Sequence, residues 1–121
     1  TVEYLKTRKE ENGGAINSQK VQFALAELQT KVDAARLLVY RSAALWSDGE
    51  SYSKEAAMAK YFASENAVKV AYQSLQIHGG YGYMKDYAIE RMYRDARIIP
   101  LYEGTSEIQK VVISRAVITG K

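Results

Sequence analysis

Residues 21–46 read VQFALAELQTKVDAARLLVYRSAALW, and this stretch decides the fold. Its apolar side chains recur in steps of four and three residues, with one longer step to the last, which is the period of an α-helix. They are Val21, Leu25, Leu28, Val32, Ala35, Val39 and Trp46. Such a stripe predicts one long helix whose apolar face packs against other helices. We expect Asn17 or Ser18 to cap its start and Asp48-Gly49 to end it.

A second long helix is predicted from about Lys54 to Ile77, where the sequence is rich in alanine. Six of its small or apolar residues share one face at helical spacing. They are Ala56, Ala59, Ala63, Ala67, Val70 and Ile77. Small side chains on that face allow a partner helix to approach closely. We expect His78-Gly79-Gly80 to stop this helix and residues 80–83 to form a turn.

Two shorter helices follow in the sequence. Asp86 is a candidate cap for a helix that carries Ile89, Met92 and Tyr93. Ser106, with Gln109 three residues later, forms a capping-box pattern. This pattern predicts a last helix that buries Ile108, Val112 and Ala116.

Residues 1–11 resemble the last turns of a helix that begins outside this chain, because they start without a capping residue. No strand alternation persists anywhere and no internal repeat is evident. The expected fold is therefore all-α, an antiparallel helical bundle of the four-helix up-and-down type, with residues 1–121 forming one domain.

Composition narrows the classes of function. The 121 residues are 47% hydrophobic and 26% charged, which is typical of a globular domain. There is no cysteine, so a disulfide or a thiolate metal site is excluded, and we predict no metal site. The net charge of +3 is spread along the chain rather than clustered, which disfavours a nucleic-acid partner. No apolar run approaches the roughly 20 residues that span a bilayer, so we expect no membrane span.

Five short segments occur in order in the second half of the chain. They are QIHGGYGY at 76–83, KDY at 85–87, ER at 90–91, RDAR at 94–97 and YEGTSEIQ at 102–109. Together they resemble the C-terminal signature of acyl-CoA dehydrogenases, and residues 26–36 are similar to the central helix of the same domain. A match this long is far more specific than a lone glycine motif.

The resemblance implies an activity and a set of partners. Acyl-CoA dehydrogenases are FAD-dependent oxidoreductases that convert acyl-CoA thioesters to trans-2-enoyl-CoA in fatty acid β-oxidation. They work as homodimers or homotetramers and pass electrons to electron-transfer flavoprotein, in the bacterial cytoplasm or the mitochondrial matrix. Their N-terminal helical and middle β-domains have no counterpart in this chain, so we expect the isolated chain to be inactive.

The resemblance also assigns roles at the substrate. Glu103 lies where the family has its catalytic base, which removes the α-proton of the thioester. Burial beneath an acyl chain would make this carboxylate more basic, and its backbone N–H would bind the thioester oxygen. Tyr102 is expected to line the acyl pocket, Gly104 to allow close approach of the substrate, and Arg115 to lie near the CoA portion.

The cofactor residues implied by the resemblance come from three segments. Thr105 and Glu107 match positions that touch the flavin, although the Thr105 hydroxyl can instead bind its own helix terminus. Gln76, Gly79 and Gly80 match a segment that reaches the FAD of a neighbouring subunit, although a plain helix stop uses the same glycines. Arg8 is the expected phosphate contact.

The sequence departs from the family at one point and leaves alternatives open. Glu11-Asn12 stands where relatives have Phe-Gly, and a carboxylate there would repel a pyrophosphate. This departure favours one rival hypothesis, a non-catalytic helical oligomerisation or binding module that keeps the fold. An acyl-CoA oxidase is a third interpretation. Among dehydrogenases, a base at position 103 favours shorter acyl chains.

Overall fold

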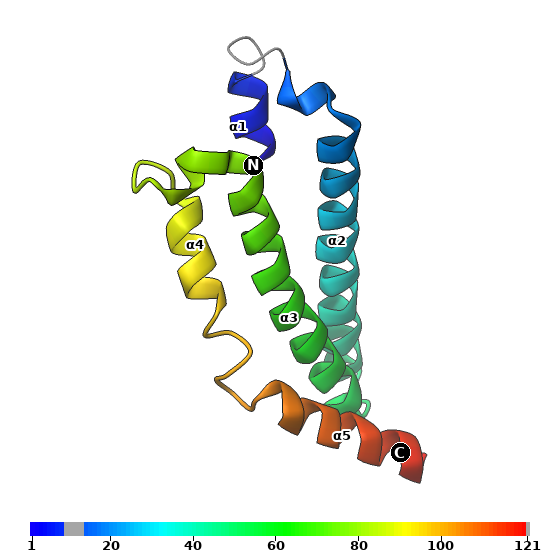
Figure 1. The fold of residues 1–121 in the computed structure, drawn as a ribbon. Coiled ribbons are helices and arrows are strands. Elements are labelled where there is room, and N and C mark those ends of the chain that lie inside the picture. The colour runs from blue at the N-terminus through cyan, green and yellow to red at the C-terminus, as the bar shows by residue number, and fades with distance from the viewer. Residues whose placement is uncertain (9–13, 121) are drawn as a thin grey trace.

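The computed structural model describes residues 1–8 and 14–120, and within them every regular element is helical. The α-helices are α1 (Val2–Thr7), α2 (Gln19–Ser47), α3 (Ser53–His78), α4 (Ile89–Ala96) and α5 (Ser106–Thr119), and two short 3₁₀ helices are η1 (Ala15–Asn17) and η2 (Gly79–Tyr83). The predicted all-α helical fold is confirmed (Figure 1). The Glu11-Asn12 pair lies outside the described residues.

Helix α3 is the centre of the fold. It contacts α2, α4, α5 and η2, whereas α2 pairs with α3 and η1. Figure 1 shows α2 and α3 side by side, with the turn between them at the same end of the molecule as α5. Gly49 has a φ of +74° in that turn, which suits glycine because it has no Cβ. The predicted stop at Asp48-Gly49 is thus confirmed, and Asp48 is the C-terminal cap of α2.

The buried core is small and lies mostly along α3. Its apolar members are Leu5, Leu28, Ala57, Ala59, Ala71 and Ala96, so four of the six are alanines. Of the six residues predicted to share one face of α3, Ala59 is buried and the other five are half-buried. The stripe on α2 is only partly covered, since Val39 is 46% exposed and Trp46 is 68% exposed. Both line an apolar cavity of about 580 Å³ between α2 and α3.

Two predicted helix caps are wrong. The N-cap of α4 is Ala88, and Asp86 lies too far before the helix to cap it. The N-cap of α5 is Thr105 rather than Ser106, because Thr105 has the extended backbone that a cap requires, and its Oγ1 accepts from the Ile108 amide at 3.4 Å. Ser18 is the N-cap of α2, but its side chain makes no capping hydrogen bond there.

The predicted buried face of α5 is also partly wrong. Ile108 is 54% exposed, whereas Val112 and Ala116 are half-buried. Helix α5 packs mainly on α3, so one side of it is covered while the other side stays exposed. Ser106, at the start of that side, is 5% exposed.

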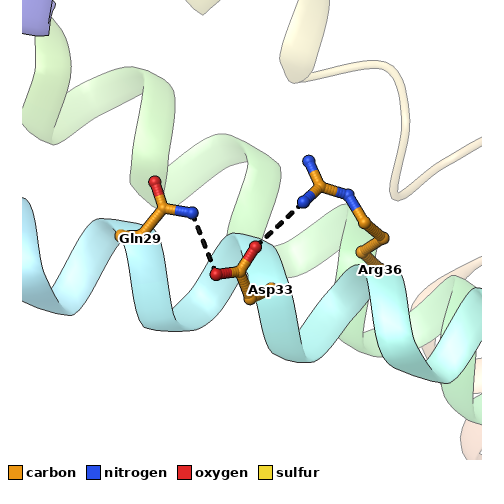
Figure 2. A network of polar contacts seen from close by, with 3 residues as sticks. All are labelled: Gln29, Asp33 and Arg36. Carbon is orange, nitrogen blue, oxygen red and sulfur yellow. Dashed lines mark hydrogen bonds and ion pairs between the residues drawn. The ribbon is translucent and has the colours of Figure 1, made fainter.

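The opposite side of α2 is polar. Gln29 Nε2 donates to Asp33 Oδ2 at 2.9 Å, and Arg36 Nη1 donates to Asp33 Oδ1 at 3.0 Å (Figure 2). These contacts link residues three and four positions apart and lie on the surface, so salt screens them and they add little stability. None of the described helices is long and apolar enough to cross a membrane.

Candidate functional site

The turn between α4 and α5 has an unusual backbone. Glu103 has a φ of +54°, and it is the sole non-glycine residue with a positive φ in residues 1–8 and 14–120. Gly104 follows with a φ of +91°. A side chain in the left-handed region is strained, and such residues persist where surrounding contacts hold them, often at active sites. The structure thus places this strain at the predicted catalytic base.

Two side chains hold the turn through its carbonyl oxygens. Lys60 Nζ, from α3, donates to the Gly104 carbonyl at 2.6 Å and to the Pro100 carbonyl at 3.3 Å. Gln109 Nε2, from α5, donates to the carbonyls of Glu103 at 3.2 Å and Gly104 at 3.3 Å. The backbone on both sides of the Glu103 Cα is therefore fixed by contacts from two helices.

The start of α5 is also tied to α3. Ser106 Oγ donates to Glu65 Oε1 at 2.6 Å, and the Thr105 hydroxyl caps the helix. The Thr105 hydroxyl therefore binds its own helix terminus in the structure, and its contact with a cofactor stays a prediction. The next acidic residue, Glu107, is exposed. Hydrogen bonds from its own backbone N–H and from the Thr105 hydroxyl lower the pKa of Glu107 below its ordinary value.

The side chains that were predicted to face a substrate are exposed. Tyr102 is 50% exposed and Glu103 is exposed as well. Neither lines any of five cavities found in the part of the chain that the structure describes. The turn thus presents a carboxylate at the surface rather than inside the bundle.

A second group of predicted residues gathers at the other end of α3. The Arg8 guanidinium lies over the Tyr81 ring, 4.0 Å from its centroid, and Arg8 Nη1 donates to Tyr4 Oη at 3.2 Å. Gly79, with a φ of +60°, and Gly80 are exposed, and a Cβ added to either would meet no atom within 4 Å. Gln76 is exposed beside them.

These two groups of residues are far apart. Lys60 marks the Glu103 end of α3, and Gly79 follows nineteen positions later. At about 1.5 Å per helical residue, the separation along α3 is about 28 Å. Arg115 lies in a third place, on the exposed side of α5, where it lines a cavity of about 360 Å³. No group of side chains that suits a metal ion occurs in the described residues.

Sequence reasoning missed Lys60 and Glu65, and it read Gln109 only as part of a capping box. One signal for Lys60 was present. It follows Ala56 by four positions and precedes Ala63 by three, so it interrupts the alanine face of a helix that was expected to be buried. A lysine there needs polar partners from another segment.

His78 is buried at the end of α3, with 6% of its surface exposed. Its ring stacks on the Tyr4 ring with centroids 4.0 Å apart, and Nδ1 lies 2.7 Å from the Ser74 carbonyl. A carbonyl can only accept, so Nδ1 carries a proton and donates. Burial lowers the pKa of His78 below its ordinary value, although the Ser74 contact opposes this.

The buried His78 predicts a pH-dependent stability. Its folded pKa lies below the unfolded one, so unfolding takes up a proton as the pH falls below about 6.5. This contribution to stability is complete above that pH and is lost as the pH drops through it. We expect His78→Phe to reduce the difference in Tm between pH 7.5 and pH 5.5. His78 is the one histidine in the sequence, so an unchanged difference would contradict this assignment.

Comparisons with known proteins show which family the chain belongs to. The sequence model of the family described as "Acyl-CoA dehydrogenase, C-terminal domain" matches residues 1–118. A 3-(aryl)acrylate reductase of Clostridium sporogenes is 55% identical, over 93% of this chain and 30% of that protein. The caffeyl-CoA reductase–Etf complex subunit CarC of Acetobacterium woodii is 46% identical, over 93% of this chain and 30% of its own length.

A solved structure is similar over the same region. Butyryl-CoA dehydrogenase of Megasphaera elsdenii superposes with a TM-score of 0.92 at 39% identity, over 97% of this chain and 30% of that one. The chain thus spans about 30% of the length of the relatives it matches. It belongs to the acyl-CoA dehydrogenase family and corresponds to the family's C-terminal all-helical domain.

Proposed function

We propose that this chain is the C-terminal part of a flavin-dependent acyl-CoA dehydrogenase, in which Glu103 is the catalytic base. One observation carries the proposal: Glu103 lies on strained backbone that two helices hold by hydrogen bonds to carbonyls, while its side chain stays exposed. A surface glutamate with ordinary backbone angles needs no hydrogen bonds from other helices to hold its conformation. Family membership supports the same role.

The proposed reaction begins at the Glu103 carboxylate. Glu103 accepts the α-proton of the acyl thioester, so the Cα–H bond breaks and its electron pair forms the α,β double bond. The Glu103 backbone N–H donates to the thioester oxygen, where negative charge develops. Gly104 has no side chain to obstruct that oxygen, and Tyr102 borders the acyl group. A bound flavin supplies the acceptor for the hydride that leaves the β-carbon.

The residues at the far end of α3 fit an anionic dinucleotide such as FAD. Gly79 and Gly80 leave open space for a phosphate, and the Arg8 guanidinium lies beside η2 on the Tyr81 ring. Gln76 adds an amide nearby, whereas Thr105 and Glu107 lie at the Glu103 end. Because about 28 Å of helix separates the two ends, we propose that they contact FAD in different subunits of a homodimer or homotetramer.

The reaction could also run in the opposite direction, as reduction of an enoyl-CoA thioester. Two of the relatives are named reductases, of 3-(aryl)acrylate and of caffeyl-CoA, and the second belongs to a complex with Etf. In reduction of an enoyl thioester, the same Glu103 carboxyl group returns the proton to the α-carbon. We propose electron-transfer flavoprotein as the redox partner, and the bacterial cytoplasm or mitochondrial matrix as the compartment. Arg115 is proposed as a contact for the CoA portion.

The absorbance spectrum of the purified parent protein tests this function. We expect bound flavin whose absorbance bleaches when butyryl-CoA is added under anaerobic conditions. Faster bleaching by a longer or aryl-substituted acyl-CoA would define the substrate, and rapid reoxidation by oxygen would indicate an oxidase. A parent protein without flavin, or one that ignores acyl-CoA, would instead favour the binding-module hypothesis. The isolated chain is expected to be inactive alone.

A further inference from the structure

Lys60 lies among alanines on α3, and its hydrogen-bond partners come from a distant part of the chain. It is half-buried on the alanine-rich helix α3, although its side chain ends in an amino group that needs polar partners. Within the described residues no carboxylate lies within ion-pair distance of it. Its two partners are backbone carbonyls at 2.6 and 3.3 Å.

Those two carbonyls bracket one short segment. Pro100 precedes the turn and Gly104 ends it, so Lys60 Nζ binds both ends of the segment that contains Glu103. A hydrogen bond from a charged donor is roughly twice as strong as a neutral one. It also fixes the direction of the Gly104 carbonyl, and hence the peptide plane that follows the Gly104 Cα, one residue after Glu103.

We propose that Lys60 is a positioning residue for the base: it holds Glu103 in the left-handed conformation that aims the carboxylate. This inference rests on the proposed function of Glu103. Without the ammonium group, Gln109 is the remaining side chain that binds the turn, through two neutral hydrogen bonds of 3.2 and 3.3 Å. The strained φ of +54° then relaxes toward ordinary values, and the carboxylate moves away from the α-proton.

A positioning role predicts an effect on the chemical step rather than on binding. In the parent protein, we expect Lys60→Met to lower the rate constant of flavin bleaching by butyryl-CoA about tenfold to 100-fold, since a displacement of about 1 Å can cost about 100-fold. The dissociation constant for butyryl-CoA, the flavin content and the Tm should change little. Lys60→Arg keeps a charged donor and should restore most of the rate.

Lys69→Met is the matched control, because Lys69 lies on the same helix but is exposed. It should leave the bleaching rate at the wild-type value. A wild-type rate in Lys60→Met would overturn the inference. The inference would also be overturned if Lys60→Met were slow and Lys60→Arg equally slow. The same holds if Lys60→Met changed only the dissociation constant for butyryl-CoA or only the Tm.

A second measurement separates this inference from the proposed function. Hydrogen exchange by mass spectrometry, without any substrate, should show faster exchange of residues 101–105 in Lys60→Met than in Lys69→Met. If acyl-CoA does not bleach the flavin of the wild-type parent protein, the proposed function fails. Hydrogen exchange of residues 101–105 then decides by itself whether Lys60 holds the turn. Equal exchange in the two variants would show that it does not.

Discussion

Glu103→Gln in the parent protein is expected to lower the rate constant of flavin reduction by butyryl-CoA by about 10²-fold to 10⁴-fold, the scale of a lost general base. Glutamine has nearly the same shape, but its amide cannot take up the α-proton. The contacts that hold the turn go to backbone carbonyls and do not involve the carboxylate. Flavin content and Tm should therefore stay at wild-type values, and stopped-flow absorbance measures the rate.

Glu50→Gln is a suitable control for that experiment. Glu50 is an exposed carboxylate in the turn between α2 and α3, and its replacement should leave the rate unchanged. If Glu103→Gln still reduced its flavin within tenfold of the wild-type rate, another group would have to be the base. The turn between α4 and α5 would then be a structural feature only.

Gly104→Ala should have the second largest effect. The residue has a φ of +91°, where an alanine is strained by about 1–3 kcal/mol. Its Cβ would lie 2.7 Å from Gln109 Nε2, so the glutamine side chain must move and release the Glu103 and Gly104 carbonyls. We expect a lower Tm together with a fall of about 100-fold in the rate of flavin reduction.

Gly49→Ala is the control that separates a general loss of stability from a displacement of the Glu103 turn. Gly49 also has a positive φ, +74°, but a Cβ there would meet no atom within 4 Å. This variant should lose a similar amount of stability and keep the wild-type rate. If Gly104→Ala lowered Tm without slowing the reaction, the position of the turn would not matter for catalysis.

The two ends of α3 explain why activity is expected to need more than this chain. The Glu103 turn presents its carboxylate at the surface, and Glu103 lines none of the five cavities found in the described residues. The proposed reaction requires a dry pocket around the weak carbon acid, and we expect other parts of the parent protein to complete it. Gly79 and Gly80 likewise line none of these five cavities. Both observations agree with a chain that spans about 30% of its relatives.

The sequence by itself determined the helices and the position of the candidate base. Helical period and glycine stops depend on neighbours in the chain, so the ends of α2 and α3 could be predicted within one or two residues. The cap of α5 was misplaced by one residue, because Thr105 and Ser106 are both good capping residues, and the backbone conformation decides between them.

Only the tertiary structure decided how Glu103 is held. Lys60 lies 43 positions before it in the sequence, and no local pattern links a lysine on an alanine-rich helix to the carbonyls of a distant turn. The positive φ of Glu103 is likewise invisible in the sequence, since a glutamate rarely adopts it without support from other segments. Packing of α5 against α3 supplies that support. It lets Lys60 bind the carbonyls of Pro100 and Gly104 while Gln109 binds those of Glu103 and Gly104.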